Sequence, residues 1–381
     1  MKEYAPRHFG KRSWSGLAIL MIGAALAIGP ARAQGPILPS ALCLVAAAAL
    51  MTAPWSTLRS VVAGYWLTIG AGALYLGVLL ADGDNAAALE FLAPAAAFLA
   101  GALTVRNSAD RRTASLVLVG VTVLVAVMAM RWTLTDDRAY AAIRLGGEAP
   151  AAVIFSTMAL VLTARLLRAA QRPGARMGKQ VPRQLRRAAP IFGAPITAAV
   201  AAMALGCALA FGAARGWIAA GAGILAFAAL LAISQQSLRP PASRLAAAGV
   251  AAALLGLGLF SEVAWAASLR DFESIRALAV RALSVEVIES ALLALMLAPL
   301  LFHAAHDALK RRSRREWGAA AFAVGLMGVC LWFAQKGALA PSMAALMSFI
   351  LAAYTPIRFR KAAAQPMRSR PRAHRSRAQP R

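Results

Sequence analysis

Charged residues are scarce in this sequence and make up only 15% of its 381 residues. Soluble domains carry about 25% charged residues, so the composition excludes an ordinary soluble protein. Cysteine and histidine are also rare, with three and four copies. Cys43, Cys207 and Cys330 lie far apart inside apolar runs, and His303 and His306 form a lone pair at an expected helix end. This spacing favours neither a disulfide framework nor a metal site, and we expect no cofactor.

Hydrophobic residues are correspondingly abundant and make up 60% of the chain. Apolar runs of about 18 residues or more recur along it, and each is long enough to cross a bilayer core as an α-helix. We therefore expect an all-α, polytopic transmembrane bundle of about twelve spans. The expected spans are 14–33, 37–54, 60–81, 86–105, 113–131, 149–168, 189–212, 216–234, 244–267, 283–304, 317–335 and 338–357.

Lys and Arg are distributed unevenly among the segments that join these runs. With the N-terminus in the cytoplasm and the spans alternating, 32 of the 41 Lys and Arg residues fall on the inner side and 9 on the outer side. This bias predicts that both termini are cytoplasmic. It also accounts for the net charge of +26 without nucleic-acid binding. We expect a multi-pass membrane protein in contact with membrane lipids.

The two ends of the chain need separate interpretations. Residues 1–357 form the expected transmembrane domain, and 358–381 form a basic tail without apolar periodicity. We expect the tail to be disordered, cytoplasmic and attracted to anionic lipid headgroups. The first apolar run is followed by "ARAQ", which leaves open a cleaved signal peptide or an uncleaved first helix. Both alternatives give the same topology for the remaining spans.

Ionisable residues near the expected outer ends of spans point to a site, because charges in a membrane are costly and usually functional. Arginine binds phosphate through two parallel hydrogen bonds and stays charged when it is partly desolvated. A substrate that is both membrane-embedded and phosphorylated fits such a site. For Arg215 and Arg276 a plain contact with lipid headgroups is the alternative. The candidate substrate-binding residues are Arg144, Arg215, Arg270, Arg276, Glu286 and Glu289.

The stretch "AARGWIAAGAGILAFAALLA" joins an Arg-Gly turn to an apolar helix. It is similar to the Ser-Arg-Gly turn, and the helix that follows it, in the O-antigen ligase and polymerase superfamily of bacterial envelopes. "IRLGGEAPAAVIFSTMALVLTARLL" is similar to the segment that enters span six, and "SLRDFESIRALAVRALSVEVIES" to the opening of the large outer loop. "KRRSRREWGAAAFAVGLMGVCLWFAQKGALAPSMAALMSFILA" resembles the closing helix pair. The likeness covers most of the chain, but it lies in layout more than in motifs.

The resemblance implies a membrane glycosyltransferase of the bacterial inner membrane. Such an enzyme moves a glycan from a polyprenyl pyrophosphate to an acceptor hydroxyl at the outer face of that membrane, in surface polysaccharide or lipopolysaccharide assembly. Arg215 matches the arginine of the family's turn, and Arg276 or Arg270 the arginine of its loop. The departures are an Ala-Arg-Gly turn, no Asn-Arg-Asn run before span six, and a short outer loop without the family's histidine. A carboxylate such as Glu148, Glu286 or Glu289 would then have to act as the base.

Two other functions remain open from the sequence. A transporter or flippase could use the same charged residues, although the expected internal repeat of such proteins is not evident. A non-catalytic scaffold in an envelope-polysaccharide assembly is favoured over an active enzyme by the missing histidine and the short loop. The arrangement of the arginines around a common site would distinguish among these functions.

Overall fold

The structure is a computed structural model of the whole chain, and it describes eight stretches of the sequence. They are residues 10–28, 37–105, 108–135, 138–170, 183–235, 285–310, 314–334 and 339–355. Within these stretches every regular element is a helix, thirteen in all. The expectation of an all-helical fold is therefore confirmed for the described residues.

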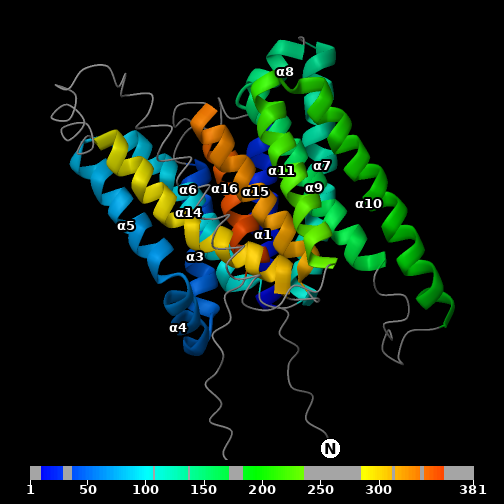
Figure 1. Cartoon of the computed structure of the whole chain (residues 1–381), viewed down its shortest axis with the longest axis horizontal. Coiled ribbons are helices and arrows are strands. Elements are labelled where there is room, and N and C mark those ends of the chain that lie inside the picture. The colour runs from blue at the N-terminus through cyan, green and yellow to red at the C-terminus, as the bar shows by residue number, and fades with distance from the viewer. Residues whose placement is uncertain are drawn as a thin grey trace, which may run out of the picture.

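Most of the helices are arranged in a bundle with their long axes side by side (Figure 1). In chain order they are α1 (Gly10–Ile28), α3 (Ile37–Thr52), α4 (Trp55–Gly64), α5 (Trp66–Ala81), α6 (Asn85–Thr104), α7 (Ser108–Thr135), α8 (Arg138–Arg144), α9 (Glu148–Ala170), α10 (Arg183–Phe211), α11 (Ala214–Gln235), α14 (Val285–Lys310), α15 (Arg315–Ala334) and α16 (Pro341–Tyr354).

Six helices in the described residues are long and apolar enough to cross a membrane, or seven if α4 and α5 together make one span. Three shorter apolar helices lie at 14–28, 37–52 and 341–354. By length and composition these are the helices of a membrane protein. The count of twelve spans and the cytoplasmic termini stay predictions. The expected span 244–267 and the basic tail 358–381 lie outside the described residues.

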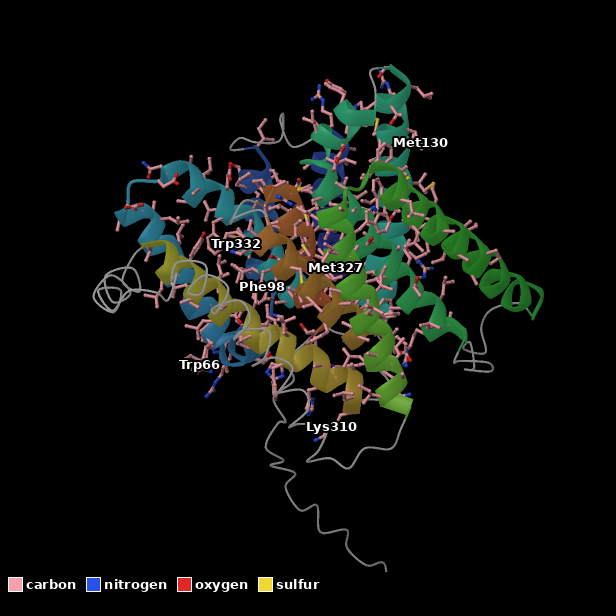
Figure 2. All side chains as sticks on the ribbon, turned by 45° about the horizontal axis from the view of Figure 1, so that its top comes forward. Trp66, Phe98, Met130, Lys310, Met327 and Trp332 are labelled. Carbon is pink, nitrogen blue, oxygen red and sulfur yellow. The ribbon has the colours of Figure 1, made fainter. Side chains whose placement is uncertain are left out.

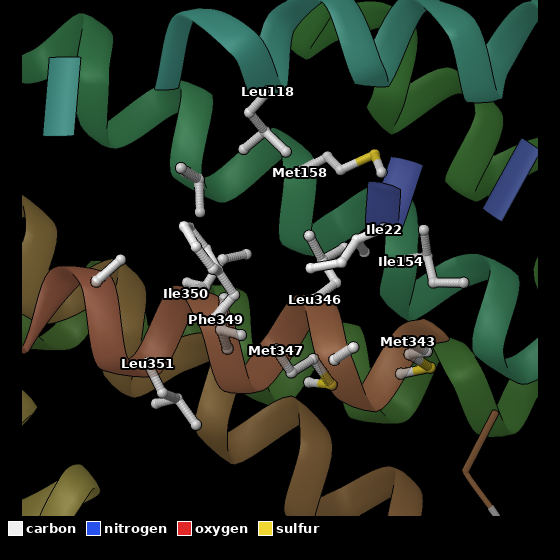
Figure 3. Close-up of a cluster of buried hydrophobic side chains, with 14 of the residues drawn as sticks. Ile22, Leu118, Ile154, Met158, Met343, Leu346, Met347, Phe349, Ile350 and Leu351 are labelled. Carbon is white, nitrogen blue, oxygen red and sulfur yellow. The ribbon is translucent and has the colours of Figure 1, made fainter. Parts of the chain in front are cut away.

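The helix α16 occupies the centre of the bundle, and most of its residues are buried. Leu346, Phe349 and Ile350 of α16 lie among apolar side chains of α1, α7 and α9 (Figure 3). On another face α16 packs closely on α6 at Gly101, where an added Cβ atom would lie 2.8 Å from the Phe349 carbonyl oxygen. Small residues let helix backbones approach each other, which is how helices pack in lipid, where the hydrophobic effect does not drive association.

The expected span 60–81 is divided in the structure, because the chain bends by 76° between α4 and α5. Tyr65 sits at the bend and is buried. Its hydroxyl donates a hydrogen bond of 2.8 Å to the Thr355 carbonyl oxygen, and the edge of its ring meets Phe98 with the centroids 5.1 Å apart. These contacts hold Tyr65 against the end of α16, so α5 begins at Trp66 rather than at residue 60.

A second short helix, α8, lies between α7 and α9 at the top of Figure 1. Gly146 and Gly147 follow it with φ angles of 93° and 114°. Side chains disfavour this left-handed region, and glycine adopts it without steric cost. The two glycines therefore reverse the chain between Arg144 and the first residue of α9.

Candidate functional site

The Arg-Gly turn at 215–216 packs directly on the start of α9. An added Cβ atom on Gly216 would lie 2.6 Å from the Ala149 carbonyl oxygen and 2.9 Å from the Ala152 Cβ. A Cβ on Gly212 would likewise lie 2.7 Å from the same Ala152 atom. Any side chain at either position would push α11 away from α9. The glycine of the turn thus sets how closely the two helix N-termini approach.

Three charged residues lie at this end of the bundle, where α8 ends and α9 and α11 begin (Figure 1). Arg215 lies in the first turn of α11 and is exposed. Glu148 is the first residue of α9 and is also exposed. Arg144 ends α8, and its guanidinium carbon lies 4.8 Å from the centre of the Tyr140 ring, with a hydrogen bond to the Tyr140 hydroxyl. We call Arg144, Glu148 and Arg215 the Arg-Gly corner.

The Arg-Gly corner has the electrostatics of an anion-binding surface. The first turns of α9 and α11 leave backbone N–H groups without helical partners, and each helix dipole places partial positive charge at this end. Arg144 and Arg215 add two guanidinium groups. Glu148 opposes them with one exposed carboxylate.

The other predicted site residues either begin α14, away from this corner, or lie outside the described residues. Glu286 and Glu289 lie on the first turns of α14. That part of α14 packs against α5 and α6, where Leu292 and Leu293 lie next to Tyr75. In Figure 1 this is the side of the bundle away from α8 and the start of α11. The side chains of Glu286 and Glu289 lie outside the described residues, as do Arg270 and Arg276.

A second group of charged residues lies at the opposite end of α9, and most of its members are buried. Arg168 of α9 pairs with Glu316 of α15, with 3.5 Å between Nη1 and Oε2, and the Glu316 side chain is 0% exposed. Arg314 pairs with Asp307 of α14 at 3.2 Å. Both pairs connect the start of α15 to a neighbouring helix.

Aromatic residues extend this group toward α16. The rings of Trp317 and Tyr354 are stacked 4.7 Å apart at an angle of 9°. Arg111 of α7 and Arg165 of α9 lie near the Tyr354 side chain. The ends of α7, α9, α14, α15 and α16 therefore meet in one place, which we call the basic end of the bundle.

Sequence reasoning missed the buried charges of the basic end, because Lys and Arg there were read only as a topology signal. A better signal was available in the acidic residues. Asp110, Asp307 and Glu316 fall on the expected inner side, where the basic excess lies, and all three are buried. A buried carboxylate is costly unless a cation faces it. An acid among inner-side arginines therefore predicts a buried ion pair.

The two charged groups suit different tasks. The ion pairs of the basic end are enclosed by packed helices, so they fix the helix ends relative to one another. The Arg-Gly corner is exposed and offers cationic groups to a ligand, so it is the candidate functional site. Comparison with known proteins adds no assignment, since no protein-family model matches the chain and no curated protein or solved structure does either.

Proposed function

We propose that the protein binds a polyprenyl-pyrophosphate-linked glycan at the outer face of a bacterial inner membrane, as a divergent relative of the O-antigen ligases and polymerases. The observation that carries the proposal is the Arg-Gly corner. Arg215 stands exposed at the first turn of a long apolar helix, and Gly216 presses that turn onto the start of α9 beside Glu148. A charged lipid carries its pyrophosphate at this depth, where an apolar helix meets water.

The chemistry of the corner supports a pyrophosphate over a neutral glycan. Guanidinium groups bind phosphate oxygens with two parallel hydrogen bonds, and a helix N-terminus adds backbone N–H donors. Arg215 supplies the exposed guanidinium, and Arg144 supplies a second one that already rests on the Tyr140 ring. Arg144 is thereby held in a fixed orientation, which lowers the entropy lost when a ligand binds.

Glycan transfer from such a lipid needs a base for the acceptor hydroxyl and cations for the departing pyrophosphate. In this proposal Arg144 and Arg215 stabilise the pyrophosphate as it leaves. Glu148 accepts the proton of the acceptor hydroxyl, since it shares the corner with Arg215, whereas Glu286 and Glu289 begin a helix on the other side of the bundle. Oxygen of the acceptor then bonds to the sugar carbon as the bond to the pyrophosphate oxygen breaks.

The test is the affinity of undecaprenyl pyrophosphate for the purified protein in nanodiscs. Arg215→Lys keeps the charge and removes the planar fork of the guanidinium, so we expect affinity to fall about tenfold or more. Arg59→Lys is the matched control, because Arg59 is an exposed arginine on α4, at the other end of the bundle. Equal affinity in the parent protein and Arg215→Lys would reduce Arg215 to a headgroup contact.

A further inference from the structure

The helix α4 differs from its neighbours in direction. It is 10 residues long and lies at 76° to α5. The helix α5 runs alongside α14 (Figure 1), and the Thr68 hydroxyl joins the two with a hydrogen bond of 3.0 Å to the Met296 carbonyl oxygen. Since α14 is one of the helices able to cross a membrane, α5 follows the same direction and α4 runs nearly across it.

The bend that separates α4 from α5 lies at the basic end of the bundle. Tyr65 at the bend is bonded to Thr355, the residue after the last turn of α16. Figure 2 shows Trp66 and Lys310 toward one end of the molecule and Met130 toward the other. The same end holds the two ion pairs of Arg168 with Glu316 and Arg314 with Asp307, and the end of α14. Thus α4 lies where the basic excess predicts the inner leaflet.

One face of α4 is buried and the other carries exposed apolar residues around a single arginine. Thr57 and Val61 are buried against the bundle. Trp55, Arg59 and Val62 follow a spacing of four and three residues, which places them on one helical stripe. Trp55 is 78% exposed and Val62 57% exposed, and Trp66 just beyond the bend is 66% exposed. No acidic residue lies between 53 and 81.

A tryptophan, an arginine and a valine on one exposed stripe match the border between lipid headgroups and acyl chains. Tryptophan is enriched at that depth because its ring is apolar while its N–H can bond to water or phosphate. Arginine reaches its guanidinium toward the headgroups while its stem stays among apolar groups. If this stripe faced water, the apolar surfaces of Trp55 and Val62 would be hydrated at a cost in free energy. If it faced the bilayer core, the Arg59 guanidinium would have no polar partner.

We propose that α4 is an interfacial helix that lies in the plane of the inner leaflet, at its headgroup border, with Trp55 and Trp66 as its anchors. The inner leaflet is the occupant of the exposed stripe. This inference does not depend on the proposed binding of a lipid pyrophosphate, because α4 and the Arg-Gly corner lie at opposite ends of the bundle. An interfacial α4 would hold the basic end of the bundle at a fixed depth in the membrane.

Nitroxide labels at paired positions test the orientation of α4. Cys43, Cys207 and Cys330 are first replaced by alanine or serine, and single cysteines are then placed at Trp55, Arg59 and Val62. The matched pair on α5 is Gly70 and Gly77, where an added Cβ atom meets nothing within 4 Å. Both pairs, 55 with 62 and 70 with 77, span seven residues, or about 10 Å of helix. Label depth is measured from oxygen and nickel-chelate accessibility in phosphatidylethanolamine–phosphatidylglycerol liposomes.

We expect residues 55, 59 and 62 to report similar depths near the headgroups, and the depth difference between 55 and 62 to be less than about half of that between 70 and 77. Three outcomes would overturn the proposal. A gradient along α4 as steep as that along α5 would make α4 part of a span. Labels with the accessibility of bulk water would place α4 away from the bilayer, and labels shielded from both reagents would show that protein covers the stripe. Affinity for undecaprenyl pyrophosphate is measured separately, so neither result decides the other.

Discussion

The Nη1 atom of Arg168 in the last turns of α9 lies 3.5 Å from the Oε2 atom of Glu316 in the first turn of α15, and the Glu316 side chain is completely buried. The other carboxylate oxygen of Glu316 has no hydrogen-bond partner among the described residues. Arg168 is therefore the cation that stabilises this carboxylate inside the bundle. The pair holds together two helices that are far apart in the sequence.

Removing one partner of this pair is expected to destabilise the protein strongly. In Arg168→Met the buried Glu316 carboxylate loses its cation, at an expected cost of about 3–5 kcal/mol. The double variant Arg168→Met/Glu316→Leu removes both charges and is expected to recover most of that loss. Unfolding in detergent, followed by heat or denaturant, measures both. Arg131→Met is the control, because Arg131 is an exposed arginine of α7. Equal stability of Arg168→Met and the parent protein would contradict a stabilising pair.

The contact of Gly216 with α9 gives a second stability test. In Gly216→Ala the new Cβ atom would lie 2.6 Å from the Ala149 carbonyl oxygen, so α11 has to move. We expect a loss of about 1–3 kcal/mol, as for overpacked cores. Gly221 lies in the same helix with open space around its Cβ position. Gly221→Ala should therefore be neutral or stabilising by up to about 1 kcal/mol. If both variants lose the same stability, the close approach of Gly216 to α9 is not the cause of the loss in Gly216→Ala.

The basic asymmetry of the sequence makes a topology prediction that exposed positions can test. Met51 at the end of α3 and Asp82 after α5 are both exposed. Alternating spans place Met51 on the cytoplasmic side and Asp82 on the periplasmic side. With the native cysteines removed, a membrane-impermeant maleimide added to intact spheroplasts should label Asp82→Cys and spare Met51→Cys until the cells are lysed. Labelling of Met51→Cys in intact cells would refute the orientation.

The sequence predicts helix positions well where hydropathy alone decides them. The expected spans 86–105 and 149–168 correspond closely to α6 (Asn85–Thr104) and α9 (Glu148–Ala170). Hydropathy could not predict the bend at Tyr65, because the hydroxyl of Tyr65 bonds to a carbonyl 290 residues away. The apolar run through residues 60–81 is continuous, and a tertiary contact interrupts the helix.

The candidate site was also predictable only in part, because tertiary contacts decide which residues lie beside Arg215. An arginine in a short turn between apolar runs is visible in the sequence, so Arg215 could be identified. Its neighbours could not, since Glu148 reaches the corner through the backbone contact of Gly216 with Ala149. Glu286 and Glu289 look equally suitable in the sequence, yet α14 begins against α5 and α6. The packing of small residues decides which carboxylate stands beside the arginine.

This difference between carboxylates gives the sharpest test of the transfer chemistry. Glu148→Gln keeps the shape of the side chain but cannot accept a proton. We therefore expect it to leave affinity for undecaprenyl pyrophosphate intact and to slow glycan transfer to an acceptor by about 10²–10⁴-fold, the usual contribution of a general base. Glu286→Gln is the matched control and should change neither quantity, because α14 begins on the other side of the bundle. Transfer is followed as loss of glycan from the lipid carrier in nanodiscs. Loss of transfer in Glu286→Gln with normal rates in Glu148→Gln would move the base to α14, and unchanged transfer in both would remove carboxylate catalysis from the proposal.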